Sequence, residues 1–107
     1  MTAKEIIEKK IAKKLHENPQ KAKEINAIIA IELSGDEKGR WVIDCTENPP
    51  KIYQDEKAPA QMTIKMKGGD FVKLANGEIN PQMAFLTGKI KIDGDLGLAM
   101  KLGSLLT

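Results

Sequence analysis

The chain has 107 residues, a length that favours one domain around a single core. Apolar residues make up 41% and charged residues 30%, as in soluble globular proteins, and a net charge of +2 is too small to indicate nucleic-acid binding. The sequence contains neither a long apolar run that could cross a membrane nor a secretory leader. Cys45 is the only cysteine, so no internal disulfide can form, and we expect a cytoplasmic location.

The N-terminal residues predict two helices. Thr2 and Glu5 have the spacing of a capping box, in which each side chain binds the other residue's backbone N–H. Apolar residues then recur at every fourth position and predict one buried helix face, made of Ala3, Ile7, Ile11 and Leu15. Asn18 followed by Pro19 predicts a second, short helix that Asn18 caps and that runs to about Ile25.

The other face of the first helix is basic. Because lysines are attracted to anionic lipid surfaces, we expect this face to dock on membranes through Lys9, Lys10, Lys13 and Lys14. The alternative is an ordinary solvated face, since Glu5, Glu8 and Glu17 lie among these lysines.

Alternation of apolar and polar residues predicts five strands. They cover residues 26–33, 41–46, 51–54, 62–67 and 89–93. In each of the longer strands one set of side chains is apolar and the other mostly polar, which indicates a sheet with one wet face. The core-facing set comprises Ile29, Ile31, Leu33, Trp41, Ile43, Cys45, Met62, Ile64, Met66, Ile90 and Ile92.

The C-terminal third adds three helices. Asp70 is the predicted cap of a helix over 71–76, Asn80 and Pro81 begin one over 82–86, and Asp95 caps the last over 96–106. Lys101 is the only charged residue inside this last helix. A helix with so few charges must be buried or must cover something apolar. Its two glycines suit a movable lid, but they suit equally a helix that packs closely on a sheet.

The predicted order is α-α-β-β-β-β-α-α-β-α within a single domain, 1–107. It indicates an α+β fold, a two-layer sandwich in which a five-stranded, mostly antiparallel sheet carries all helices on one face. The only interior of such a sandwich lies between sheet and helices, so an apolar pocket would be enclosed there.

The sequence offers few groups for catalysis. His16 is the only histidine and lies near a helix end, and Cys45 is expected to face the core, so neither suggests a nucleophile with its base. One histidine and one cysteine cannot form a zinc site, and no phosphate-binding glycine motif is present. We therefore expect no enzyme activity, no cofactor, no metal and no nucleic-acid partner.

Residues 70–102 resemble the sterol carrier protein type 2 family, the non-specific lipid-transfer proteins. The motifs that carry the resemblance are Asp-Phe at 70–71, Asn-Pro-Gln-x-Ala-Phe at 80–85, Gly-Lys-x-Lys-x-x-Gly at 88–94 and Gly-Leu-Ala-Met-Lys-Leu at 97–102. Trp-Val-Ile-Asp at 41–44 also looks like the second strand of the family.

The resemblance implies intracellular lipid binding and transfer. A fatty acid, fatty acyl-CoA or sterol would lie in a tunnel between sheet and helices, closed by the C-terminal helix. By position, helical residues would line or close this pocket, namely Phe71, Leu74, Met83, Phe85, Leu86, Leu98, Leu102 and Leu105. Its floor would be formed by strand residues, namely Ile29, Ile31, Trp41, Ile43, Ile64 and Met66.

Three expectations complete this interpretation. We expect a monomer that touches membranes transiently. The chain ends in Leu105-Leu106-Thr107 rather than a Ser-Lys-Leu-type tripeptide, so peroxisomal import would require a larger protein. The alternative to a carrier is a protein-interaction or accessory module whose pocket is filled by its own side chains and binds no lipid.

Overall fold

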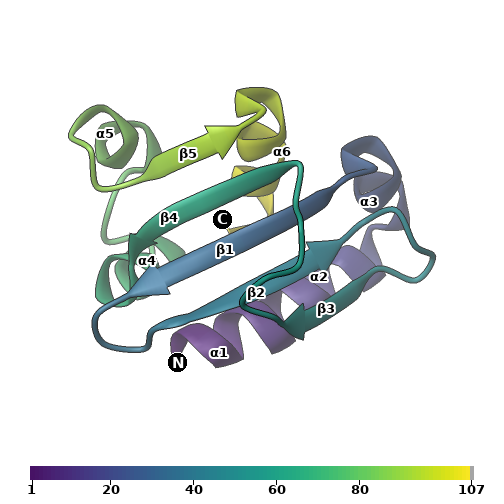
Figure 1. Cartoon of the computed structure of the whole chain (residues 1–107), viewed down its shortest axis with the longest axis horizontal. Coiled ribbons are helices and arrows are strands. Elements are labelled where there is room, and N and C mark those ends of the chain that lie inside the picture. The colour runs from purple at the N-terminus through teal and green to yellow at the C-terminus, as the bar shows by residue number, and fades with distance from the viewer. Residues whose placement is uncertain (107) are drawn as a thin grey trace.

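Five strands form one sheet in the computed structural model, which describes the backbone of residues 1–106 and the side chains of residues 1–103 (Figure 1). The strands are β1 (Ile28–Ser34), β2 (Gly39–Asp44), β3 (Lys51–Gln54), β4 (Met62–Lys67) and β5 (Lys91–Gly94), in the order β3-β2-β1-β4-β5. β1 and β4 are parallel, and the other three neighbouring pairs are antiparallel. The predicted five-stranded, mostly antiparallel sheet is confirmed.

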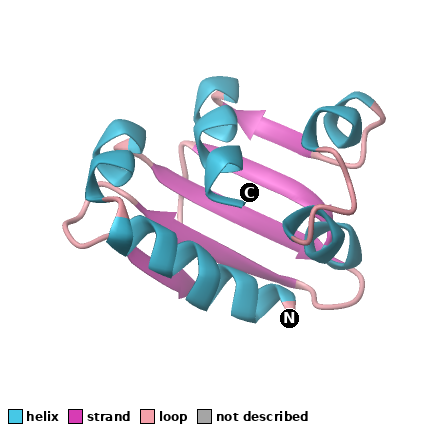
Figure 2. Ribbon diagram, turned by 180° about the vertical axis from the view of Figure 1, so that it is seen from behind, coloured by secondary structure: helices cyan, strands magenta, loops and turns pink. Residues whose placement is uncertain are grey.

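The helices all cover one face of this sheet, as Figure 2 shows from behind. They are α1 (Ala3–Glu5), η1 (Ile6–Ile11), α2 (Ala12–Glu17), α3 (Pro19–Ile25), α4 (Gly68–Ala75), α5 (Pro81–Leu86) and α6 (Leu96–Leu106). α1, η1 and α2 follow one another without a break and form the predicted first helix. The α+β class, the order of elements and the one-sided helix layer are therefore as expected.

A π-helical stretch, η1, keeps the first helix on the core. On an α-helix, residues four apart drift around the axis by about 40° at each step, because four residues exceed one turn of 3.6. A π-helix has more residues per turn and drifts the other way. The combination leaves the four residues of the predicted apolar face 0–1% exposed, namely Ala3, Ile7, Ile11 and Leu15.

The predicted helix caps are partly confirmed. The capping box is present, since Thr2 Oγ1 accepts from the Glu5 N–H at 3.1 Å and Glu5 Oε1 accepts from the Thr2 N–H at 3.1 Å. The caps at Asn80 and Asp95 are also formed. Asn18 occupies the N-cap position before Pro19 and α3 ends at Ile25, as predicted, but its side chain caps no N–H group, because its amide donates back to the Lys14 carbonyl at 3.0 Å. The cap at Asp70 is wrong as well, since α4 continues directly from β4 and begins at Gly68.

Strand alternation correctly separated the two faces of the sheet. The core-facing residues of β1, β2 and β4 are at most 8% exposed and join the first helix in one hydrophobic core. Ala30 and Val42 point the other way, yet they are also fully buried and pair across β1 and β2. Something must therefore cover the outer face at this point.

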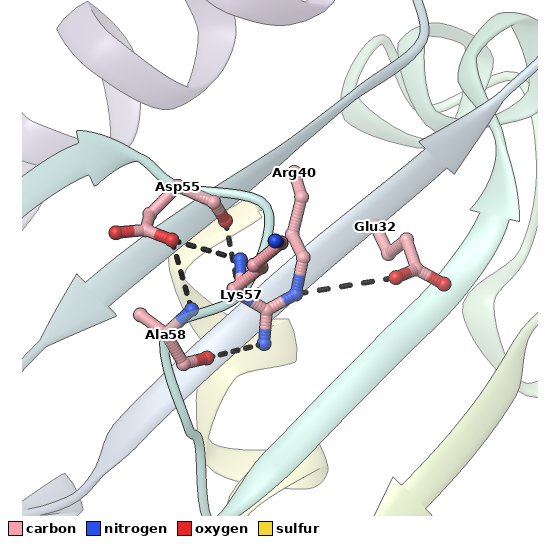
Figure 3. A network of polar contacts seen from close by, with 5 residues as sticks. All are labelled: Glu32, Arg40, Asp55, Lys57 and Ala58. Carbon is pink, nitrogen blue, oxygen red and sulfur yellow. Dashed lines mark hydrogen bonds and ion pairs between the residues drawn. The ribbon is translucent and has the colours of Figure 1, made fainter.

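The cover is the connection from β3 to β4, which runs across the outer face (Figure 1). It has to cross, because β3 lies at one edge and β4 lies beyond β2 and β1. Arg40 holds it in place, with its guanidinium donating to the carbonyls of Asp55 at 2.9 Å and Ala58 at 2.7 Å (Figure 3). The Asp55 carboxylate accepts from the backbone N–H groups of Lys57 and Ala58, which holds the Asp55 pKa below its usual value.

A partly buried hydrogen bond joins the first helix to the sheet. Trp41 is 2% exposed, and its indole Nε1–H donates to Glu8 Oε2 at 2.9 Å. Glu8→Ala would leave this donor without a partner, so we expect a loss of about 1–3 kcal/mol in the free energy of unfolding, measured by urea denaturation.

The matched control is Glu17→Ala on the same helix. Glu17 makes only an exposed contact to Lys13 at 3.9 Å, so its removal should change stability by less than about 0.5 kcal/mol. Equal losses in the two variants would contradict a special role for the Glu8–Trp41 bond.

Candidate functional site

The helix layer covers the sheet in two parts. The first helix lies over the β3 and β2 side, where η1 contacts β3 and Glu8 bonds Trp41. α6 contacts β4 and β5, while α4 contacts β1 and β4. The long first helix therefore closes one half of the interior, and three shorter helices cover the other half.

An apolar cavity of about 830 Å³ lies in this second half, between β4–β5 and the helices α4, α5 and α6. None of the described residues that line it has an ionisable side chain. The lining residues are Ile64, Met66, Phe71, Leu74, Asn80, Pro81, Gln82, Phe85, Leu86, Ile90, Ile92, Leu96, Ala99, Met100 and Gly103. The Asn80 side chain is occupied, because its oxygen accepts the N–H groups of Gln82 and Met83. The volume falls in the range of sites for small organic ligands.

The cavity is open to solvent along an apolar rim. Of its lining residues, Leu86 is 76% exposed and Met100 is 79% exposed, while Phe85 and Leu96 are about half exposed. Apolar side chains gathered at the mouth of a pocket mark a place where an apolar ligand or surface binds. No helix within residues 1–106 is long and apolar enough to span a bilayer.

Six of the fourteen predicted site residues line this cavity. They are Ile64, Met66, Phe71, Leu74, Phe85 and Leu86. Four floor residues do not line it and pack in the hydrophobic core; these are Ile29, Ile31, Trp41 and Ile43. Met83 is exposed on the side of α5 away from the cavity. The side chain of Leu105 lies outside the described residues.

On α6 the predicted residues Leu98 and Leu102 do not line the cavity. Leu98 packs against the core and Leu102 is fully buried, whereas the cavity is lined by the face that carries Leu96, Met100 and Gly103. Both faces of this helix are apolar, so periodicity alone does not distinguish them. Ile90 and Ile92 were also missed, although their alternation already placed them on the inner face of the sheet.

The groups that could carry chemistry lie elsewhere. His16 is exposed near the end of α2, and neither His16 nor Cys45 lines the cavity. Cys45 is buried, and burial, together with the Asp44 charge, raises the pKa of its thiol to about 11, which leaves it protonated at neutral pH. The described residues contain no group of histidine, cysteine, aspartate and glutamate side chains that could hold a metal ion.

The four lysines expected to dock on membranes are not equivalent. Lys10 is half-buried and its ammonium donates to the Ala75 carbonyl at the end of α4 at 3.1 Å, so it fastens the first helix to α4. Lys13 lies 3.9 Å from Glu17 in an exposed ion pair. Lys9 is exposed and Lys14 is half-exposed. Lys9, Lys13 and Lys14 are therefore the members of this group that remain available on the surface.

Known proteins are similar to this chain in sequence and in fold. Sterol carrier protein 2 of Rattus norvegicus is 39% identical over 104 residues, which are 94% of this chain and 19% of that protein. The sterol carrier protein domain 2 of Helicoverpa armigera has 28% identity and a TM-score of 0.76, covering 98% of this chain and 86% of that one. Sterol carrier protein 2 of Aedes aegypti, solved with the C16 fatty acid palmitate, has 21% identity and a TM-score of 0.80, covering 100% and 96%.

The chain spans about a fifth of the length of the curated relatives it matches, since it covers 22% and 19% of two of them. The sequence model of one protein family, the SCP-2 sterol transfer family, matches residues 5–107, which is nearly the whole chain. The motifs at 70–102, the fold and the relatives agree, and this chain belongs to the SCP-2 sterol transfer family.

Proposed function

We propose that this chain binds a lipid reversibly in the cavity beside α4, α5 and α6 and transfers it between membranes without chemical turnover. The observation that carries the proposal is the open cavity of about 830 Å³ without an ionisable group in its lining. A fatty acid, a fatty acyl-CoA or a sterol each has an apolar part that suits such a lining. The palmitate held by the Aedes aegypti protein of the same fold supports a ligand with a long acyl chain.

The energetics allow useful affinity. Each buried methylene contributes about 0.8 kcal/mol, so a 16-carbon chain supplies on the order of 10 kcal/mol before the costs of association. Micromolar binding requires about 8 kcal/mol, which this burial can provide for a well-covered chain. An open cavity of this size also favours a carrier over a module whose interior is filled by its own side chains.

In this proposal α6 acts as a lid that stays anchored on its core side and moves at the cavity opening. Leu102 anchors α6 in the core, and Lys101 donates to the Glu24 carbonyl in α3 at 3.2 Å. Leu96 and Met100, on the cavity side, lie at the opening. Uptake would then widen the gap between α5 and α6 while Leu102 stays in place.

Native mass spectrometry of gently purified protein is the direct test of the proposal. A carrier should retain a lipid, seen as an added mass that disappears after delipidation and returns with palmitate. Protein that gains no mass with palmitate, oleate or cholesterol would contradict lipid binding.

Gly103→Leu should lower lipid affinity without unfolding the protein. Gly103 lines the cavity, and a Cβ added there meets no atom within 4 Å, so larger side chains extend into free space. Replacing a helical glycine also raises helix propensity by up to about 1 kcal/mol. We expect a graded loss of affinity for a fluorescent fatty acid through Gly103→Ala, Leu and Phe, with unchanged or higher thermal stability.

Gly69→Leu is the matched control. Gly69 is also a helical glycine with free space around its Cα, but it lies in α4 outside the cavity. Its substitution should leave lipid affinity unchanged. Equal loss of binding in Gly69→Leu and Gly103→Leu would show that the ligand does not occupy this cavity.

We further propose that Lys9, Lys13 and Lys14 dock the first helix on anionic membranes. Each lysine near such a surface contributes about 1 kcal/mol at low salt. The variant with all three changed to Gln should transfer lipid to anionic vesicles several-fold more slowly, and the difference should vanish at high salt as the Debye length shortens.

The control variant changes Lys23, Lys38 and Lys57, which are also exposed, to Gln. Both triple variants lose three positive charges, so a docking role predicts slower transfer only for the helix variant. Indistinguishable transfer rates would assign the effect to net charge.

A further inference from the structure

A second hollow lies at one end of the sheet, next to the apolar cavity. Its volume is about 520 Å³, and it differs from the cavity in being lined mainly by polar and charged residues. We call it the lysine groove after four of its members. It is lined by Glu32, Ser34, Lys65, Met66, Lys67, Asp70, Thr87, Gly88, Lys89 and Lys91.

The groove lies where the sheet has a notch. β5 pairs with β4 only from Met62 to Lys65, because β5 begins at Lys91, the partner of Lys65. Met66 and Lys67 extend beyond this pairing, and residues 87–89 pass them as a turn. Met66 lines both the apolar cavity and the lysine groove. The two hollows therefore share Met66 in their walls, and one is lined mainly by apolar residues and the other mainly by polar and charged residues.

The charges of the groove are unbalanced. Lys65 and Lys91 face each other across the strand pair, an arrangement of like charges that costs stability. Within the described part of the chain, none of the four lysine ammonium groups makes a hydrogen bond or an ion pair. Of the two carboxylates in the groove, Glu32 is the partner of Lys65 in the β1–β4 register and also lies 3.9 Å from Arg40. Four exposed ammonium groups thus face two carboxylates, one of them shared.

The described lining of the cavity offers no cation to the charged group of an anionic lipid. We propose that the lysine groove binds the phosphate of an amphiphilic ligand whose acyl chain occupies the cavity, through Lys65, Lys67, Lys89 and Lys91. This inference rests on the proposed function and narrows its ligand class to phosphate-bearing lipids. Several ammonium groups at one place suit the double charge of a phosphate monoester better than the single charge of a carboxylate.

The test compares two lipids that share one acyl chain. 1-Palmitoylglycerol 3-phosphate carries the phosphate, and 1-palmitoylglycerol does not; each is titrated by calorimetry below its micelle concentration. We expect the parent protein to bind the phosphate lipid about tenfold more tightly, as charge-assisted hydrogen bonds would provide. The variant with the four groove lysines changed to Gln should lose this preference and keep its affinity for 1-palmitoylglycerol.

Two controls remove general explanations. Lys4, Lys23, Lys38 and Lys57 are exposed outside the groove, and changing them to Gln shifts the net charge from +2 to −2, as in the groove variant. This control should keep the preference for phosphate. All four groove lysines are exposed, and their removal relieves repulsion, so the groove variant should unfold at no lower urea concentration than the parent.

The outcomes separate the inference from the proposed function. Equal affinity of the parent for both lipids, or an unchanged preference in the groove variant, would overturn the role of the lysines while lipid binding stands. Glycerol 3-phosphate alone binding as tightly as its palmitoyl form would make the groove a site for free phosphate and would also overturn the inference. If neither lipid binds the parent, the proposed function itself fails.

Discussion

The width of the sheet governs this structure. Five strands spaced by about 4.8 Å span about 19 Å, whereas one helix is about 10 Å across, so a single helix cannot cover the apolar face. The first helix covers the side of β2 and β3, and it does so fully because η1 keeps its apolar residues in line. The remaining half is left to α4, α5 and α6, which enclose space instead of filling it. The cavity thus arises where the second row of helices meets the sheet.

The architecture was predictable because the longer strands alternate and most helices begin at a recognisable residue. The core-facing residues of β1, β2 and β4 follow from that alternation, and the motifs at 70–102 indicate the family. The sequence could not show which inward-facing residues pack only in the core and which also line the cavity. Ile29 and Ile64 look alike as inward-facing strand residues and both belong to the hydrophobic core, but only Ile64 also lines the cavity, which depends on where the helices lie. The burial of Ala30 and Val42 could not be predicted from the sequence either, because it depends on the β3–β4 connection, which runs across the outer face of the sheet.

Charged and apolar side chains lie on opposite faces of β4. Strand alternation places Ile64 and Met66 toward the helices and Lys65 and Lys67 on the opposite side, within one short strand. A complete sheet would keep these two environments apart. Because β5 begins only at Lys91, Met66 at this end of β4 lines both the apolar cavity and the lysine groove. This combination matches the two parts of an amphiphile, and it requires only that one edge strand be shorter than its neighbour.

A cavity of this size persists only if the helices that line it are anchored to the rest of the protein through their other faces. α5 is fixed by Ala84, which is 1% exposed and whose carbonyl accepts the N–H groups of Lys89 at 2.8 Å and Ile90 at 3.2 Å. α6 is fixed by Leu98 and Leu102 on its core side. Each of these helices therefore uses one face for anchorage and leaves another apolar face to the ligand. This double use explains why α6 is apolar nearly all round, and why apolar periodicity, which reports burial alone, could not tell its anchoring residues from those that line the cavity.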